Sequence, residues 1–305
     1  RCRYVNPRSE RQLADVPDDP AGLCMLPGGV LAIASCGAGP GGVQFVAARN
    51  DSDPQKLAAC RASSLATRHL DWPMGLACTN DGLLVCSYLD ASAALYKFTN
   101  NGLVAEPATV PALASYDRGF KKCAVHQQTQ RTYAIGEDGG GNHALVLLDA
   151  DLQVVATVET VVAPEDATEL EYYPPIRDVA VHGDQVIVLT GNDHDKGSGL
   201  RLLDLDGRFM STIAAGQLCN PQAVAASCGR AFVVDDDVDD DDDDDYEGTG
   251  KVLYIIDIQS GDIIQRAHID LKGAITQMIV DGDEIYLSGY TSSKVVVLQL
   301  AGSEA

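Results

Sequence analysis

The sequence predicts an all-β protein, a six-bladed β-propeller whose blades are four-stranded antiparallel sheets. Three observations support this fold class: short apolar runs separated by turn sequences, the recurrence of this pattern along 305 residues, and the spacing between its copies. Repeats of roughly 45–55 residues that each hold three or four short strands are typical of propellers.

The clearest copy of the pattern lies between Pro73 and Gly102. Its apolar runs are separated by the turn sequence Asn80-Asp81-Gly82 and by a short polar gap, and the last run ends at Asn100-Asn101-Gly102. Asn-Gly and Asp-Gly turns between apolar runs are a strong signal for β-hairpins, because Asn and Gly readily adopt the left-handed backbone of tight turns. The segment therefore predicts an antiparallel meander.

The same pattern recurs along the whole chain. Its copies start near Gly22, Gly75, Lys122, Arg177, Gln222 and Thr276, with spacings of 53, 47, 55, 45 and 54 residues. We therefore expect residues 1–305 to form a single domain of six blades. No segment has a convincing helical period of apolar residues, which disfavours an α/β barrel of similar length.

The two ends of the chain predict how the ring closes. The sixth copy ends near Leu300 after its third predicted strand, so one strand is missing from its blade. A short semi-apolar piece, residues 12–16, precedes the first copy. We expect this N-terminal piece to supply the outermost strand of the sixth blade, because pairing there closes the ring and covers an open sheet edge.

Several short sequences carry a family resemblance. They are Pro73-Met74-Gly75-Leu76-Ala77, Asn80-Asp81-Gly82, Leu84-Val85-Cys86-Ser87, Leu95-Tyr96-Lys97-Phe98 and Asn101-Gly102, with Asn220-Pro221-Gln222-Ala223-Val224-Ala225 in the fifth copy. These sequences resemble the NHL-type repeat of six-bladed propellers. The Asp that usually follows the second strand of that repeat is Ser87 in the clearest copy, Ser288 in the last and Asp235 in the fifth. The resemblance implies the fold and says little about activity.

The charge of the chain is strongly negative. With 44 acidic and 22 basic residues the net charge is −22, and residues 235–247 form an acidic low-complexity stretch. An acidic surface repels phosphates and anionic lipid, so the sequence disfavours nucleic acid as a partner, and no apolar run is long enough for direct membrane insertion. The acidic stretch predicts a solvated loop, where the residues from Asp239 to Asp245 could attract cations or a basic partner.

The nine cysteines do not form a zinc pattern, because no Cys-x-x-Cys pair is present. Several lie within apolar runs, where a small buried thiol explains them. In an oxidising compartment, three pairs could face one another across hairpins: Cys24/Cys36, Cys78/Cys86 and Cys219/Cys228. The first residue, Arg1, suggests either that a leader has been removed, as in an organellar or secreted protein, or that the sequence begins inside a longer chain.

Functional residues are expected on one face of the propeller. This face is built by the loops that lead into the inner strands and by the loops between second and third strands. The candidates for partner or ligand binding on these loops are Trp72, Tyr116, Asp117, Arg118, Tyr173, Arg177, Asn220 and Gln222. The alternative is structural: the aromatic side chains fill grooves between blades and the arginines pair with neighbouring carboxylates.

Metal binding is a second hypothesis for the same loops, which also carry Glu137 and Asp138. The candidate ligands are Asp193, Asp195, Asp235 and Asp236, whose carboxylates suit Ca²⁺, although they lack the spacing of an EF-hand loop. His126 and His182 end equivalent inner strands in adjacent copies, and two His side chains with a carboxylate would make a metal site. No third ligand for these two is evident.

The function predicted from these features is a non-catalytic protein-interaction or assembly module. It would bind a protein partner through the loop face, as an accessory subunit of a larger complex. The sequence contains no Gly-x-Ser-x-Gly elbow, P-loop or dinucleotide motif. The alternative is a metal-dependent hydrolase or lyase with its site at the mouth of the central channel, because six-bladed propellers that resemble this chain include calcium-dependent lactonases.

Overall fold

The computed structural model describes residues 3–36, 42–62, 72–88, 93–99, 102–103, 108–109, 119–138, 140–159, 175–191, 198–236, 251–271, 273–289 and 293–302. The chain divides into two compact units. Unit 1 holds Arg1–Arg11, Val158–Ser292 and Val296–Ala305, and unit 2 holds Gln12–Thr157 and Ser293–Val295. All sheets of the described residues pair antiparallel wherever a register is defined, so the all-β class is confirmed.

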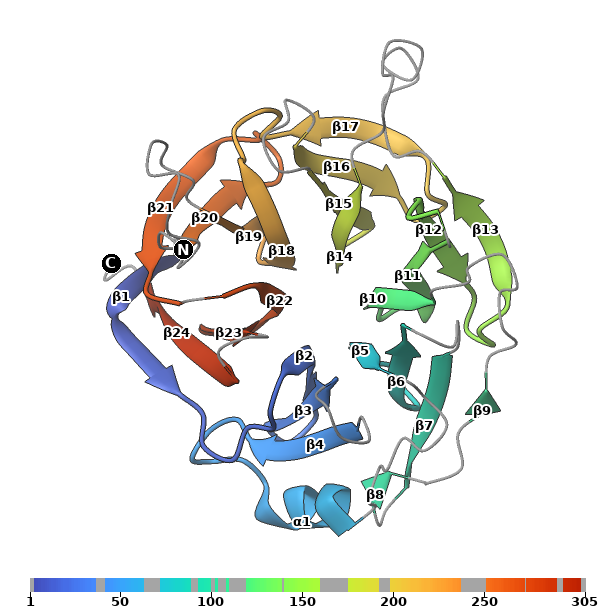
Figure 1. The fold of residues 1–305 in the computed structure, drawn as a ribbon, viewed down its shortest axis with the longest axis vertical. Coiled ribbons are helices and arrows are strands. Elements are labelled where there is room, and N and C mark those ends of the chain that lie inside the picture. Colours follow the sequence, from blue (N-terminus) through green and yellow to red (C-terminus); the bar gives the residue numbers. More distant parts are fainter. Residues whose placement is uncertain are drawn as a thin grey trace. The chain divides into compact units, whose positions relative to one another are not determined.

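Unit 2 contains three sheets whose strands pair in chain order (Figure 1). The first is β2 (Pro20–Leu26), β3 (Val30–Ser35) and β4 (Gly42–Ala47). The second is β5 (Pro73–Cys78), β6 (Gly82–Ser87), β7 (Ala93–Thr99) and β8 (Gly102–Leu103), with β9 (Ala108–Thr109) also on β7. The third is β10 (Phe120–His126), β11 (Arg131–Glu137), β12 (His143–Leu148) and β13 (Val154–Val158).

Unit 1 contains the other three sheets, apart from the short ends of strands that fall in unit 2. One is β14 (Ile176–His182), β15 (Gln185–Thr190), β16 (Gly199–Asp204) and β17 (Phe209–Ile213). The next is β18 (Asn220–Ser227), β19 (Arg230–Asp236), β20 (Lys251–Asp257) and β21 (Ile263–Ile269). The last joins β22 (Ile275–Asp281), β23 (Glu284–Gly289), β24 (Lys294–Gly302) and β1 (Arg3–Gln12).

The expectation of six equal four-stranded blades is wrong for the first copy. Five of the six sheets have at least four strands, but the sheet of β2, β3 and β4 has only three. Helix α1 (Pro54–Ala62) packs against β4, where Arg61 Nε donates a hydrogen bond to the Phe45 carbonyl at 2.9 Å. The sequence did not indicate this helix, because its apolar residues do not follow a helical period. Within the described residues, no helix has the length and hydropathy of a membrane-spanning segment.

The N-terminal strand lies earlier in the chain than expected. Strand β1 covers Arg3–Gln12, so residues 12–16 are not its body, and it is the neighbour of β24 in the last sheet. Arg11 and Glu284, which belong to this sheet, form an ion pair with 2.8 Å between Nη2 and Oε1. One sheet therefore contains strands from both ends of the chain.

The apolar core lies between neighbouring sheets. In β6, Leu83 and Val85 belong to a cluster shared with the β2–β4 sheet, whereas Leu84 and Cys86 belong to a cluster shared with the β10–β13 sheet. Successive side chains of a strand point to opposite faces, so both faces of β6 are buried. This arrangement explains why the second strands are almost continuous apolar runs, and why a single sheet cannot bury its own apolar surface.

A β-bulge recurs near the start of the inner strand in all six sheets. The pairing register skips the second residue of the inner strand in five sheets and the third residue in β18. The skipped residues are Ala21, Met74, Lys121, Arg177, Gln222 and Thr276. A bulge turns one side chain out of the regular alternation and re-aims it. The bulges therefore place one selected side chain at the same end of every sheet.

The residue after the bulge lies close to the next inner strand. A Cβ on Gly22 would lie 2.2 Å from the Met74 carbonyl oxygen, and one on Gly75 would lie 3.1 Å from the Lys122 Cα. At the equivalent position of β14, the buried Asp178 carboxylate instead accepts a hydrogen bond from the Val224 N–H at 2.9 Å. Contact between neighbouring inner strands thus depends on the residue at this single position.

We expect Gly22→Ala to destabilise the protein by about 3 kcal/mol and Gly75→Ala by about 1 kcal/mol. The added Cβ of the first variant would overlap backbone atoms of the next inner strand, whereas that of the second would only be in tight contact with them. Urea denaturation of the two variants measures this difference. Equal, small effects of the two substitutions would contradict the packing described for these strands.

Candidate binding site

One end of the β10–β13 sheet in unit 2 carries a cluster of polar side chains around Glu137. Lys121 is the bulge residue of β10, Glu137 ends β11 and His143 begins β12, so the fold brings three separate segments together. Glu137 and His143 are direct partners in the register of β11 and β12. This end is the one formed by the loop into the inner strand and the loop between second and third strands.

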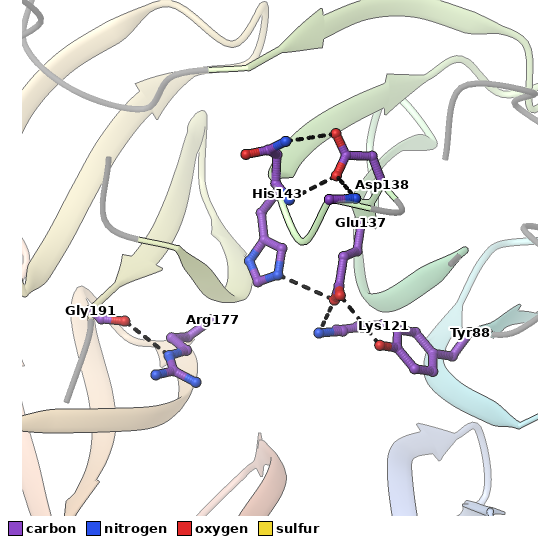
Figure 2. Close-up of polar contacts among 9 residues, drawn as sticks. Tyr88, Lys121, Glu137, Asp138, His143, Arg177 and Gly191 are labelled. Atoms are coloured by element: carbon purple, nitrogen blue, oxygen red, sulfur yellow. Dashed lines mark hydrogen bonds and ion pairs between the residues drawn. The ribbon is translucent and has the colours of Figure 1, made fainter. Parts of the chain in front are cut away.

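Glu137 is the centre of this cluster and is only 3% exposed. It forms an ion pair with Lys121, its Oε2 lies 3.3 Å from His143 Nε2, and the Tyr88 hydroxyl donates to its Oε1 at 3.4 Å (Figure 2). A buried carboxylate is tolerated only where cations and hydrogen-bond donors replace the water that it loses. The three donors around Glu137 meet that requirement.

Tyr88 and Trp72 extend the Glu137 cluster toward the surface from the neighbouring sheet. Trp72 precedes β5 and Tyr88 follows β6, and the Tyr88 N–H donates to the Trp72 carbonyl at 3.1 Å. Their rings are stacked, with centroids 6.3 Å apart and an interplanar angle of 24°. Lys121 Nζ lies 5.0 Å from the centroid of the Tyr88 ring, a cation–π contact. We call Trp72, Tyr88, Lys121, Glu137 and His143 the Glu137 cluster.

Trp72 is the exposed member of the Glu137 cluster. Trp72 is 43% exposed, and its backbone has a φ of 57°, in the left-handed region that few non-glycine residues adopt. The tryptophan does not fill a groove between sheets, which was the structural alternative for this residue. Its carbonyl accepts the hydrogen bond from the Tyr88 N–H, and its indole stacks on the Tyr88 ring at the surface.

Asp138 organises the loop that leads to His143. Its carboxylate accepts hydrogen bonds from the N–H groups of Gly140 and Asn142 at 2.9 and 2.8 Å, and from the Asn142 side chain at 2.8 Å (Figure 2). The hydrogen bonds from Asn142 hold the pKa of Asp138 below its ordinary value. The Asp138 carboxylate therefore stabilises this loop and holds Asn142, the residue next to His143, in place.

A second cluster occupies the equivalent end of the β18–β21 sheet in unit 1. The Asp236 carboxylate accepts hydrogen bonds from Asn220 Nδ2 at 3.1 Å and Gln222 Nε2 at 2.5 Å, and it pairs with Lys251. Gln222 is the bulge residue of β18, and its Oε1 accepts from the Ile275 N–H at 2.6 Å. Asp236 and Lys251 are register partners, as Glu137 and His143 are in the β10–β13 sheet.

Asp235 is buried beside Asp236 and serves the backbone. It accepts hydrogen bonds from the N–H groups of Cys219 at 2.8 Å and Asn220 at 2.6 Å. Burial, together with the neighbouring charge of Asp236, raises the pKa of Asp235 to about 6 against the hydrogen bonds that lower it. This carboxyl anchors the loop into β18.

The bulge residue of β14 makes the corresponding contact in its own sheet. Arg177 Nε donates a hydrogen bond to the Gly191 carbonyl at 2.9 Å, directly after the end of β15 (Figure 2). Lys121, Arg177 and Gln222 therefore each reach the end of the second strand of their own sheet. This is a repeated feature of the polar bulge residues.

The structure brings together four of the predicted site residues and separates or omits others. Asn220, Gln222, Asp235 and Asp236 meet in one cluster, Trp72 belongs to the other, and Arg177 lies at its own bulge. Tyr116, Asp117, Arg118, Tyr173, Asp193 and Asp195 lie outside the described residues. Sequence reasoning missed Tyr88, Lys121, His143 and Lys251, although aligning the copies at their bulges would have marked Lys121.

The expected metal ligands have other partners in the described part of the chain. His126 Nδ1 lies 2.7 Å from Thr129 Oγ1, and His182 Nε2 accepts from the Gly229 N–H at 2.9 Å. Among the described residues, no group of three or more His, Cys, Asp or Glu side chains is placed to hold one ion. The calcium hypothesis stays a prediction, since Asp193 and Asp195 are not among these residues.

Comparison with known proteins identifies the fold. No protein-family model matches the chain, and no curated protein matches it by sequence. Three similar solved structures are a hydrazine synthase of Kuenenia stuttgartiensis (15% identity, TM-score 0.59, 94% of this chain and 78% of that one), a protein of unknown function from Bacteroides thetaiotaomicron (9%, 0.64, 97% and 73%) and a nidogen/laminin complex (10%, 0.56, 82% and 80%). At these identities the likeness shows the fold alone, which is a β-propeller with four-stranded antiparallel blades.

We expect the Lys121–Glu137 ion pair to contribute far more than an exposed pair. A double-mutant cycle with Lys121→Met and Glu137→Gln, measured by urea denaturation, should give a coupling free energy of about 1–2 kcal/mol, because the Glu137 side chain is only 4% exposed. The matched control is Arg208→Met with Asp204→Asn, whose side chains are 78% and 36% exposed, with an expected coupling below about 0.5 kcal/mol. Equal couplings for the two pairs would contradict the role given to Glu137.

Asp235 predicts a pH dependence of stability. Its folded pKa of about 6 lies above the unfolded value, so the folded state holds the proton more tightly. The favourable contribution is complete below about pH 4 and is lost as the pH rises through 6, by about 3 kcal/mol in total. Denaturation of the wild type and Asp235→Asn across this range should show the loss only in the wild type. Asp184→Asn, which removes an exposed carboxyl, should keep the pH profile of the wild type. A difference in stability between Asp235→Asn and the wild type that does not change with pH would refute the prediction.

Proposed function

We propose that this chain is a non-catalytic protein-interaction module whose partner binds at the Glu137 cluster, with Trp72 as the anchoring side chain. The observation behind this proposal is a solvent-exposed indole that stacks on Tyr88, which contacts the buried Glu137 carboxylate. Tryptophan, tyrosine and arginine are the side chains that most often dominate binding energy at protein interfaces. A preorganised anchor also loses little conformational entropy on binding.

The polar groups beneath Trp72 indicate what the partner must supply. The Glu137 oxygens already accept from Lys121, His143 and Tyr88, so this carboxylate has little capacity left for a partner. The Lys121 side chain, in contrast, is 29% exposed and carries three N–H groups. We infer a partner segment that places an apolar side chain on Trp72 and a carbonyl or carboxylate oxygen near Lys121.

The finer architecture belongs to the same proposal. We propose that the chain is an NHL-type propeller and that β1, paired beside β24, completes the last blade. The similar structure that contains nidogen and laminin is a complex, which makes a binding role for a chain of this fold reasonable. The predicted attraction of cations or a basic partner to the stretch from Asp239 to Asp245 stays a separate prediction, as these residues are not described.

Selection of peptides from a random phage-displayed library tests the proposal without a known partner. Peptides that lack tryptophan are selected on the wild-type protein, and their affinities are measured for wild type and Trp72→Ala. We expect Trp72→Ala to bind at least about 10-fold more weakly, since anchoring side chains contribute about 2 kcal/mol or more. Trp72 is the only tryptophan of the chain, so a change in its fluorescence on binding reports directly on this site.

The matched control is Val155→Ala, which removes a 51% exposed apolar side chain from β13 in the same unit. Its affinity for the selected peptides should equal that of the wild type. Peptides that bind Trp72→Ala as tightly as the wild type, with unchanged Trp72 fluorescence, would show that the binding surface lies elsewhere. A measurable enzymatic turnover that requires Glu137 would replace the proposal with a catalytic one.

A further inference from the structure

Two cysteines of unit 2 lie together in a way that the sequence did not predict. Cys24 lies in β2 and belongs to the apolar cluster between the first two sheets, and Cys78, which ends β5, packs against this cluster. The inner strands β2 and β5 are in contact, and the two thiols are close enough to affect each other's pKa. Each also lies near a backbone carbonyl, with Cys24 Sγ 3.8 Å from the Met25 oxygen and Cys78 Sγ 3.5 Å from the Thr79 oxygen.

The hairpin pairs expected from the sequence are wrong. Strand register places Cys24 opposite Ala32 rather than Cys36, and Cys78 opposite Leu83 rather than Cys86. Cys219 and Cys228 flank the two ends of β18, so they do not face one another across a hairpin. The reason is that facing residues in a hairpin are set by the turn, whereas Cys24 and Cys78 meet through the packing of two sheets.

The backbone geometry of β2 and β5 explains the proximity. Gly22, two residues before Cys24, has no side chain, and a Cβ there would lie 2.2 Å from the Met74 oxygen and 3.1 Å from Leu76 Cγ. The missing side chain lets the two inner strands approach closely along their length. This approach brings the later residues of β2 and β5, including the two cysteines, into contact.

The two thiols differ in accessibility and in charge environment. Cys24 is buried, and its pKa is raised well above the ordinary value, first by the hydrogen bond to Cys78 and then by burial. Cys78 is partly exposed, and the hydrogen bond from Cys24, with the nearby charge of Lys56 in α1, lowers its pKa. Oxidants attack the more accessible thiolate first. An asymmetric pair of this kind has one attacking and one resolving cysteine.

We propose that Cys24 and Cys78 form a peroxide-sensitive thiol pair that closes a disulfide between β2 and β5. The Cys78 thiolate attacks one oxygen of hydrogen peroxide, which breaks the O–O bond and leaves a sulfenic acid on Cys78 and a hydroxide ion. The Cys24 sulfur then attacks the Cys78 sulfur, the hydroxyl leaves, and the thiol proton of Cys24 converts it to water. The two sulfurs are oxidised, and the peroxide is reduced to two waters.

The disulfide would join the first two sheets covalently at their inner strands. The first sheet has only three strands, and α1 lies beside its third. A link between β2 and β5 restricts the unfolded chain and therefore stabilises the folded form. Oxidation would strengthen the attachment of this sheet, and a thiol reductant would reverse the effect.

Peptide mapping of the native full-length protein tests the proposal. The protein is treated with hydrogen peroxide, remaining thiols are alkylated in denaturant, and trypsin digestion separates residues 12–49 from residues 69–97. These peptides contain Cys24 with Cys36 and Cys78 with Cys86, respectively. We expect a link between the two peptides that tandem mass spectrometry assigns to Cys24 and Cys78. The oxidised protein should also unfold at a higher urea concentration, and dithiothreitol should reverse the shift.

Variants assign the order of the two steps. In Cys24→Ser the sulfenic acid on Cys78 should persist and be captured by dimedone, whereas Cys24 in Cys78→Ser should remain a thiol. Cys60→Ser is the matched control, because Cys60 is buried in the same cluster and should leave the link intact. Links confined within each peptide would overturn the proposal. Oxidation of the exposed Cys219 and Cys228 while Cys78 stays reduced would overturn it as well.

Discussion

The bulge at the start of every inner strand is the constraint on which the polar chemistry of this protein depends. A regular strand alternates its side chains between two faces, and in these sheets both faces are buried against neighbours. A charged side chain at a regular position of such a strand is buried and needs a partner there, as Asp178 has in the Val224 N–H. The bulge interrupts the alternation once in every inner strand, at the same end of the sheet, and there Lys121, Arg177 and Gln222 reach the end of the adjacent strand.

Buried carboxylates at the ends of the second strands are stabilised by different partners in different sheets. Glu137 is surrounded by a lysine, a histidine and a tyrosine, so its charge is neutralised locally. Asp235 receives backbone N–H groups but lies beside a second carboxylate, and its pKa rises. The arrangement around Glu137 leaves an exposed aromatic side chain and a lysine at the surface, whereas the arrangement around Asp235 holds the loop into β18. The sheets thus share the same backbone arrangement, and differences at single residues give each sheet a different polar site.

Much of the fold could be predicted from the sequence because turn residues and apolar runs act locally. Asn80-Asp81-Gly82 marks the hairpin between β5 and β6, and the strands of the copies lie close to their expected positions. Helix α1 was missed, and the N-terminal strand was placed at residues 12–16 rather than Arg3–Gln12, because both elements depend on tertiary packing rather than on their own pattern. The site was predicted only in part: Trp72, Asn220 and Gln222 were found by their loop position. Lys121 and His143 were missed because their partners are distant in sequence and set by register.

The shared sheet at the two termini has a consequence for how the chain can fold. Arg11 and Glu284 are separated by 273 positions, yet they pair in one sheet with β1 beside β24. Pairing across so long a separation must overcome a large loop-closure entropy and is slow. During synthesis, β1 emerges well before β24, so its neighbour in the sheet does not yet exist. The strand β1 therefore lacks its sheet partner until β24 has been made.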